Sequence, residues 1–308
     1  VSYQVDIEKV KNIIKEIINK HDKILKRPEA FVRLNAQLSS TLDFSVKVWV
    51  MNPDYWTVYF DLTEQVYIAF NKNKAFVCSF DGTVAVIDTA VLEIEKLITV
   101  GRNPDGIAVA NNKVYVSNSG GLDYPNYDNT VSVIDVNSLT EIKKIPVRIN
   151  PYIIVPDNYG DVYVVSRGNY GDVKMCLQII DSKTDELTYT FPDLEVLNLA
   201  INKDTAYVYY YDFMSGSGSA IMTINVKDET IISNNFITDG TNVETAYGIA
   251  VDKQSGDVFI TDAHGFVNTG NVICFNSAGK KKYSFTAGLN PGHIAFLNKM
   301  NVDTLQFD

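Results

Sequence analysis

The spacing of apolar residues changes along the first fifty positions of the chain. From Asp6 onward, apolar residues recur every three or four positions, as in Ile7, Val10, Ile14, Ile17 and Ile18. That period predicts an amphipathic helix whose first turn is capped by Asp6. Two stretches follow, residues 32–38 and 42–50, in which every second residue is apolar. Such alternation predicts two strands that pair as an antiparallel hairpin.

A second helix is predicted after the hairpin. Asn52 followed by Pro53 combines a capping residue with a first-turn proline, so the helix should run from Pro53 to about Glu64. We expect it to bury some of its four aromatic residues, Tyr55, Trp56, Tyr59 and Phe60. The order of elements is then helix, strand, strand, helix.

This segment resembles a known family. The stretches VSYQVDIEKVKNIIKEIINKH, PEAFVRLNA and FSVKVWVMNPDYWTVYFDLTE are similar to the C-terminal cytoplasmic α/β domain of the small-conductance mechanosensitive channel MscS. In that family the domain lines a soluble vestibule below a heptameric pore. The membrane spans, the middle β domain and the short final strand of the family are not found here, and a pore needs its membrane spans. We therefore expect residues 1–65 to form a packed module without channel activity.

The remainder, residues 66–308, repeats a strand-rich pattern about every 44 residues. One run of the pattern occurs as KAFVCSF, KVYVSNS, DVYVVSR, TAYVYYY and DVFITDA, beginning at Lys74, Lys113, Asp161, Thr205 and Asp257. The next run occurs as TVAVID, TVSVID, LQIID, AIMTIN and NVICFN, beginning at Thr83, Thr130, Leu177, Ala220 and Asn271. A recurring four-strand unit is typical of one blade of a β-propeller.

The repeats predict a mainly β fold, a β-propeller of about five blades, joined to the small N-terminal α/β module. We count five units from Tyr67 to Ala287. The run HIAFL, His293 to Leu297, is expected to be the first strand of a sixth unit. The run from Val66 to Phe70 is expected to serve both as the end of the second helix and as the first blade strand.

The repeated segments resemble a second family. GRNPDGIAVANNKVYVSNSGGLDYPNYDNTVSVID, VYVVSRGNYGDV, ISNNFITDGT and YGIAVDKQSGDVFITDA are similar to the YncE-like surface-layer β-propellers, which include the BtuG-like cobalamin-binding surface lipoproteins. Those propellers usually have seven blades. The resemblance implies capture of cobalamin or another large polar nutrient for an outer-membrane transporter, and a location at the cell surface.

Charge and cysteine usage narrow the classes of function. The net charge of −10 opposes binding to nucleic acid or to anionic lipid, both of which require clustered lysine and arginine. No stretch reaches the roughly 18 apolar residues that a bilayer crossing needs. The first residues lack the features of a secretory signal, so the chain as written would stay in the cytoplasm, against the surface location that the resemblance implies. Cys78, Cys176 and Cys274 lie far apart in apolar runs, and we expect buried thiols.

The candidate binding face consists of the long loops that follow the second strand of each unit. These loops, 118–129, 167–174, 212–219 and 262–270, are rich in aromatic and polar residues, whereas the turns at the opposite ends of the strands are short. Flat rings beside amide and guanidinium donors suit a large organic ligand with a polar rim, such as cobalamin or a glycan. The candidate ligand-binding residues are Asn118, Tyr124, Tyr127, Arg167, Asn169, Tyr170, Tyr211, Asp212, Tyr247, Asp262 and His264.

No catalytic constellation, resident metal or cofactor is expected. The aspartates at the ends of the V-I-D runs, Asp88, Asp135 and Asp181, recur in successive units, so we expect them to accept hydrogen bonds from turn backbone. His21, His264 and His293 lie in unrelated contexts. The run 123–129 offers oxygen ligands but lacks the glycine and glutamate of a calcium loop.

The leading interpretation is therefore a non-catalytic, ligand-binding propeller. Two alternatives stay open. In the first, the chain is a structural or interaction module that the MscS-like segment oligomerises. In the second, it is a propeller lyase or lactonase, whose metal site Asp262 and His264 would begin.

Overall fold

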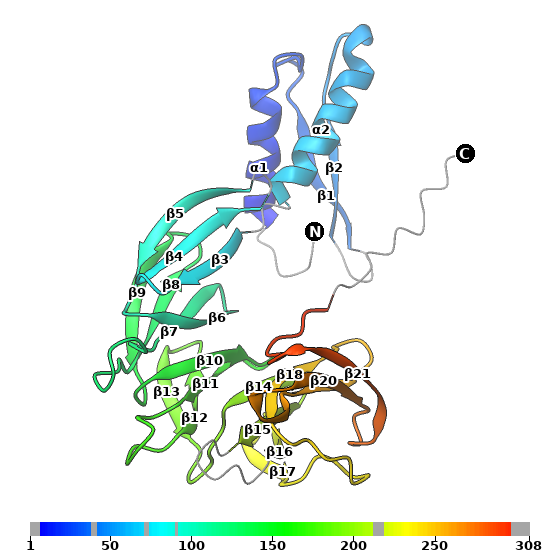
Figure 1. The fold of residues 1–308 in the computed structure, drawn as a ribbon. Coiled ribbons are helices and arrows are strands. Elements are labelled where there is room, and N and C mark those ends of the chain that lie inside the picture. The colour runs from blue at the N-terminus through cyan, green and yellow to red at the C-terminus, as the bar shows by residue number, and fades with distance from the viewer. Residues whose placement is uncertain (1–6, 38–41, 71–73, 90–91, 212–218, 297–308) are drawn as a thin grey trace. The chain divides into compact units, whose positions relative to one another are not determined.

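The computed structural model shows a mainly β protein with one helical segment near its N-terminus (Figure 1). It describes residues 7–37, 42–70, 74–89, 92–211 and 219–296. The chain divides into two compact units, Val1–Ala75 with Ile87–Glu95, and Phe76–Val86 with Lys96–Asp308.

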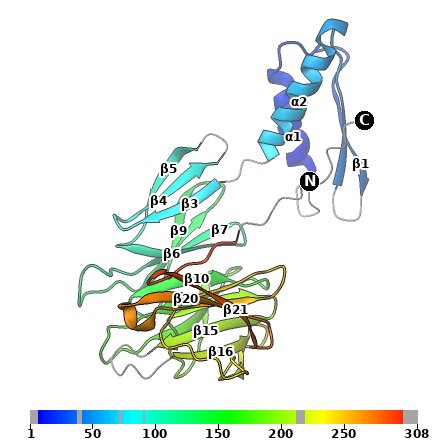
Figure 2. The same cartoon turned by 45° about the vertical axis from the view of Figure 1, so that its right-hand side comes forward.

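The smaller unit has the predicted order of elements, which Figure 2 shows from a second direction. Its elements are α1 (Ile7–Lys20), β1 (Phe31–Gln37), β2 (Leu42–Lys47), the 3-10 turn η1 (Asn52–Asp54) and α2 (Tyr55–Phe70). The predicted hairpin is confirmed, because β1 and β2 pair antiparallel with Val32 opposite Val46. Asp6, the expected cap of α1, lies outside the described residues.

The helical period explains the core of this unit. Val10, Ile14 and Ile18 lie one turn apart on α1, and all three are buried against Val32 and Val58. Within the described ranges, no helix has both the length and the apolar character that a membrane crossing demands.

The expected burial of the α2 aromatic residues is wrong. Tyr55, Trp56, Tyr59 and Phe60 are between 52% and 63% exposed. Val58, and Leu62 one turn later, occupy the core-facing side of α2, which turns the rings away from the core.

The start of the repeated part also differs from the prediction. Val66–Phe70 is the last part of α2 and forms no strand. A short apolar run of this kind is compatible with either structure, and here the helix that precedes it continues. The first sheet therefore has three strands, in the order β3-β4-β5: β3 (Lys74–Ser79), β4 (Thr83–Asp88) and β5 (Glu93–Thr99).

Four further sheets follow, each antiparallel and each built from four consecutive strands. The second sheet contains β6 (Pro104–Ala110), β7 (Lys113–Asn118), β8 (Thr130–Asp135) and β9 (Thr140–Pro146). The third contains β10 (Pro151–Pro156), β11 (Asp161–Ser166), β12 (Cys176–Asp181) and β13 (Glu186–Thr190). The fourth contains β14 (Asn198–Asn202), β15 (Thr205–Tyr211), β16 (Ser219–Asn225) and β17 (Thr230–Ser233). The fifth contains β18 (Ala246–Val251), β19 (Val258–Asp262), β20 (Thr269–Phe275) and β21 (Lys281–Leu289).

Successive sheets of the larger unit pack against one another in chain order. The buried apolar residues form clusters that join the second sheet to the third, the third to the fourth and the fourth to the fifth. The first strands β6, β10, β14 and β18 are neighbours in that order. The approach of β6 to β10 is close: a Cβ atom added to Gly106 would lie 2.0 Å from the carbonyl oxygen of Tyr152.

The turns after the third strands repeat one conformation. In all five sheets the fourth residue beyond that strand has a positive φ, namely Leu92, Leu139, Asp185, Glu229 and Gly279. The expected role of the V-I-D carboxylates is confirmed for two of them. Oδ1 of Asp135 accepts hydrogen bonds from the backbone of Asn137 and Ser138, and Oδ1 of Asp181 accepts one from Lys183.

The expected first strand of a sixth unit is not formed. His293–Phe296 has no strand conformation, and Leu297 lies outside the described residues. A strand needs a partner to satisfy its backbone groups, and the described residues contain no strand after β21 to pair with it. The ring of Phe296 instead lies 5.2 Å from that of Phe259 on β19, measured between ring centroids.

Candidate functional site

A cavity of about 720 Å³ lies among the first strands of the larger unit. Its volume is within the range typical of sites for organic ligands. It is lined by Tyr152, Arg167, Tyr170, Leu197, Asn198, Tyr209, Tyr247, Phe266, Asn290, Gly292 and His293.

Aromatic side chains from three sheets form most of the cavity wall. Tyr152 comes from β10, Tyr209 from β15 and Tyr247 from β18, and Phe266 follows β19. The rings of Tyr247 and Phe266 meet edge to face at 5.3 Å, and the hydroxyl of Tyr209 donates to the carbonyl oxygen of Tyr247 at 2.5 Å. Burial raises the pKa of both Tyr152 and Tyr209, so these phenols remain neutral hydrogen-bonding groups at physiological pH.

Arg167 brings a permanent positive charge to this apolar wall. The residue follows β11, and its guanidinium carbon lies 3.4 Å from the centroid of the Tyr152 ring, an arrangement typical of a cation–π contact. Asp105 at the start of β6 lies 3.6 Å from one guanidinium nitrogen. Burial raises the pKa of Asp105, while Arg167 and His293 act in the opposite direction.

Three of the residues predicted from the sequence line this cavity, namely Arg167, Tyr170 and Tyr247. Two more extend from it, because Tyr170 meets Tyr127 edge to face at 6.2 Å and Tyr127 meets Tyr124 at 6.1 Å. Desolvation is the main cause of the raised pKa of Tyr127. The row of three tyrosines ends at Tyr124, whose ring is largely exposed.

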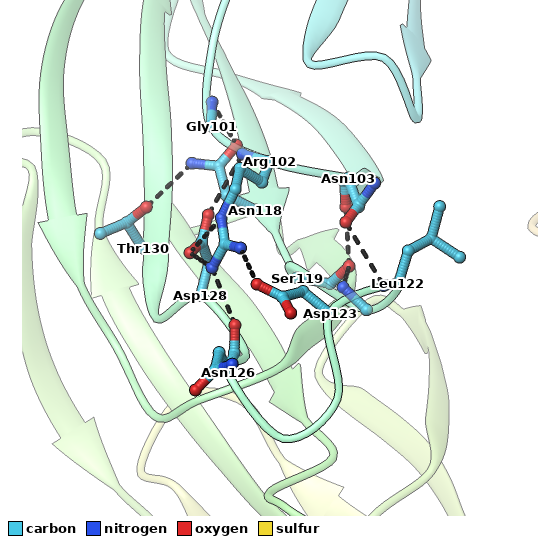
Figure 3. A network of polar contacts seen from close by, with 11 residues as sticks. Gly101, Arg102, Asn103, Asn118, Ser119, Leu122, Asp123, Asn126, Asp128 and Thr130 are labelled. Carbon is cyan, nitrogen blue, oxygen red and sulfur yellow. Dashed lines mark hydrogen bonds and ion pairs between the residues drawn. The ribbon is translucent and has the colours of Figure 1, made fainter.

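Other predicted residues are occupied by contacts within the fold. Asn118 is fully buried; its side-chain oxygen accepts a hydrogen bond from the amide of Gly101, and its nitrogen donates to Thr130 and Ser132 (Figure 3). Buried Asp262 likewise accepts from the amides of residues 244, 245 and 264. Each of these two side chains thus binds the backbone just before the first strand of its own sheet, at Gly101 before β6 and at residues 244–245 before β18.

Asn169, His264 and Tyr211 also lie outside the cavity lining. Asn169 stabilises its own loop by accepting from the amides of Gly171 and Val173. His264 contacts Asn271 and Glu244, at 2.9 and 3.3 Å. Tyr211 is buried beside Phe266. Asp212 lies outside the described residues.

A second hollow, of about 700 Å³, is lined in part by Arg102, whose guanidinium is largely engaged within the fold. Figure 3 shows Arg102 reaching into the 119–129 loop, where it donates to Asp123 at 2.6 Å, to Asp128 at 2.6 and 3.1 Å, and to the carbonyl oxygen of Asn126 at 2.8 Å. The two carboxylates that were weighed as calcium ligands are therefore paired with Arg102. This network holds the loop in place.

Sequence reasoning missed eight residues of the cavity lining: Tyr152, Leu197, Asn198, Tyr209, Phe266, Asn290, Gly292 and His293. A signal for some of them is present. The pair Asn-Pro recurs at 103–104, 150–151 and 290–291, and the asparagine has a positive φ each time. The residues that follow the last two of these prolines, namely Tyr152, Gly292 and His293, line the cavity. The Asn-Pro turn thus marks a point where the chain enters the cavity lining.

Comparison with known proteins identifies the first part of the chain. The family model "Mechanosensitive ion channel MscS, C-terminal" matches residues 1–75. Residues 1–75 are an MscS C-terminal domain. A small-conductance mechanosensitive channel of Edwardsiella ictaluri is 38% identical over 74 residues, which are 24% of this chain and 26% of that protein.

Two Buchnera aphidicola proteins show the same likeness. Uncharacterised MscS family proteins of the subspecies Acyrthosiphon pisum and Baizongia pistaciae are 36% and 34% identical over 74 residues, 24% of this chain in each case and 24% and 26% of those proteins. The chain thus spans about a quarter of the length of these curated relatives. The likeness is confined to the MscS C-terminal domain.

Among solved structures, the chain resembles hydrazine synthase of Kuenenia stuttgartiensis. The TM-score is 0.55 at 18% identity, and the alignment covers 70% of this chain and 63% of that one. At this identity the likeness concerns the fold alone.

Proposed function

We propose that the five sheets from β3 to β21 form a β-propeller that captures a ligand without transforming it. Support for the architecture comes from five successive sheets, from the clusters that join neighbouring sheets, and from the adjacency of β6, β10, β14 and β18. Radial packing of four-stranded sheets about their first strands is how a propeller is built. The repeated positive-φ turn supports a common ancestry of the five units.

The observation that carries the function is the cavity at these first strands. Its described lining consists of aromatic rings, one leucine, one glycine, two amides, one guanidinium and one imidazole, and contains no serine, cysteine or carboxylate. Rings supply contact area, and the few polar groups supply orientation, which is the usual design of a small-molecule site. The ligand we propose is a large organic molecule with a polar rim.

Cobalamin is the first ligand to test, because of the resemblance to BtuG-like surface lipoproteins, and a glycan is the second. The same resemblance leads us to propose a place at the cell surface, with transfer of the ligand to an outer-membrane transporter.

Calorimetric titration of the 308-residue chain with cyanocobalamin tests this proposal. We expect binding, and a loss of affinity of at least tenfold in Tyr247→Ala, which removes a ring from the cavity wall. Tyr189→Ala is the matched control, since Tyr189 is an exposed ring on β13 outside the lining, and it should bind like the wild type. A folded protein that binds neither cyanocobalamin nor any glycan of an array would contradict ligand capture.

A second candidate function is supported by α2. Trp56 lies 5.1 Å from Tyr55, 5.9 Å from Tyr59 and 6.0 Å from Phe60, and the four rings form one exposed aromatic surface. Exposed apolar surfaces of this kind commonly mark interaction sites. In this second proposal, the MscS C-terminal domain serves to associate copies of the chain.

Light scattering after size-exclusion chromatography tests the second candidate. Self-association is expected in the wild type and should be lost in Trp56→Glu. Thr57→Glu, on the same helix but outside the aromatic surface, should leave the mass unchanged. A wild-type chain that is monomeric at all concentrations removes the support for this function.

A further inference from the structure

Two arginines in the larger unit use their guanidinium groups in opposite ways. The Arg102 guanidinium makes four hydrogen bonds to loop 119–129, so four of its five N–H groups are used within the fold. Among the described residues, the side chain of Arg167 contacts Tyr152, to which it also hydrogen-bonds, and Asp105. Its contacts are the face of the Tyr152 ring and the Asp105 carboxylate at 3.6 Å, a separation longer than a charge-assisted hydrogen bond.

The stacking of Arg167 decides where its free donors point. A guanidinium carries its N–H groups in its own plane. The Tyr152 ring covers one face of that plane, and Tyr152 and Asp105 take up part of its edge, so the N–H groups that are not turned to them remain available. The side chain is only 27% exposed, and it lines the cavity. Its donors are therefore held ready at the wall of a site that an organic molecule can fill.

Electrostatics at this wall favours an acidic group. Arg167 is the lining residue with a permanent charge, and the described lining contains no carboxylate. Asp105 lies 3.6 Å from one guanidinium nitrogen and outside the lining. A planar fork of N–H donors matches the two oxygens of a carboxylate or a phosphate.

Building on the proposed function, we propose that Arg167 binds the acidic oxygen group, carboxylate or phosphate, of a ring-bearing ligand whose body lies against Tyr247, Phe266 and Tyr209. Asp105 acts as a positioning residue for the guanidinium. Because the arginine is already stacked and partly buried, little side-chain entropy is lost when the anion binds.

The test uses three probes of one shape: 2-naphthoate, 2-naphthyl phosphate and uncharged 2-naphthamide. We expect the full-length wild-type chain to bind at least one anionic probe ten- to a hundredfold more tightly than the amide, with a preference that falls as salt is added. Whichever anion is preferred identifies the chemical source of the acidic group. In Arg167→Gln the anion and the amide should bind within twofold of each other, and Arg167→Lys should recover part of the preference.

Arg148→Gln serves as the matched control. Arg148 is a half-buried arginine of the same unit that does not line the cavity, so the anion preference should persist. Thermal melts verify that each variant is folded. An amide bound as tightly as both anions, or a preference that survives Arg167→Gln, overturns the assignment and leaves ligand capture standing. A folded wild type that binds none of the three probes, no cyanocobalamin and no glycan of the array overturns both proposals.

Discussion

A buried ion pair between two sheets should contribute strongly to the stability of the larger unit. Nζ of Lys113 on β7 contacts both carboxylate oxygens of Asp185, each at 2.7 Å, in the turn after β12. The hydroxyl of Tyr115 donates to the same carboxylate at 2.5 Å. Both charged side chains are only 13% exposed. The second and third sheets are thus joined by one desolvated cluster.

Replacement of Asp185 by asparagine isolates the charge in this cluster. Asp185 has a φ of 57°, a conformation that asparagine tolerates well, so the backbone should not change. At 2.7 Å and an effective dielectric constant of 20, the gross attraction is about 6 kcal/mol, much of which offsets desolvation of the two charges. Leaving Lys113 buried without its partner should reduce the free energy of unfolding by about 2–3 kcal/mol.

Urea denaturation followed by far-ultraviolet circular dichroism measures this loss. Both tryptophans, Trp49 and Trp56, lie in the smaller unit, so their fluorescence does not report on the sheets. Asp204→Asn is the matched control, because Asp204 also accepts from a lysine, Lys227, and a tyrosine hydroxyl but is 49% exposed. Its loss should be clearly smaller than that of Asp185→Asn, because an exposed ion pair contributes little to stability. Equal losses in the two variants would refute the reasoning from burial.

Three further predictions concern single positions. Burial raises the pKa of Cys176 to about 11, so at pH 8 its thiol is almost entirely protonated and unreactive. We therefore expect Cys176 to react with a disulfide reagent at pH 8 only after the protein unfolds, which the absorbance of the released thiolate measures. Glu229→Gly should raise the free energy of unfolding by about 1 kcal/mol, because Glu229 has a φ of 55°, a left-handed conformation that glycine adopts without strain. Glu186→Gly is the control: Glu186 lies in strand β13, where glycine should lower the free energy of unfolding. Backbone hydrogen bonds lower the pKa of Asp135, so Asp135→Asn should be less stable than the wild type near pH 7. Urea denaturation at a series of acidic pH values should show that this difference in stability vanishes as the pH falls through the lowered pKa.

Local patterns in the sequence predicted the elements well. The spacing of Val10, Ile14 and Ile18 follows from the period of one helix, and the strand runs that begin at Lys113 and Thr130 begin strands at the same residues. Each of these patterns depends on residues that are close in sequence. The spacing of apolar residues along the chain therefore predicts these helices and strands directly.

Errors arose where a local pattern allowed two outcomes. The four rings of α2 were expected to be buried because they are large and apolar, but the side of the helix that faces the core was already taken by Val58 and Leu62. Residues 66–70 are equally suitable for a strand, and the direction of the preceding helix decided their structure. Neither decision is visible in a window of a few residues.

The candidate site shows a different limit of sequence reasoning. Polar loop residues were judged by type and position, which placed Asn118 and Asp262 beside Arg167 as equals. In the structure the first two use their hydrogen-bonding groups on the backbone and side chains of their own sheets, whereas only part of the Arg167 guanidinium is engaged, by Tyr152 and Asp105. A polar residue is available to a ligand only when the fold has not already satisfied it, because a buried donor or acceptor without a partner is costly. That accounting requires the neighbours in space, and it is what separates a residue that builds the loop from one that can bind.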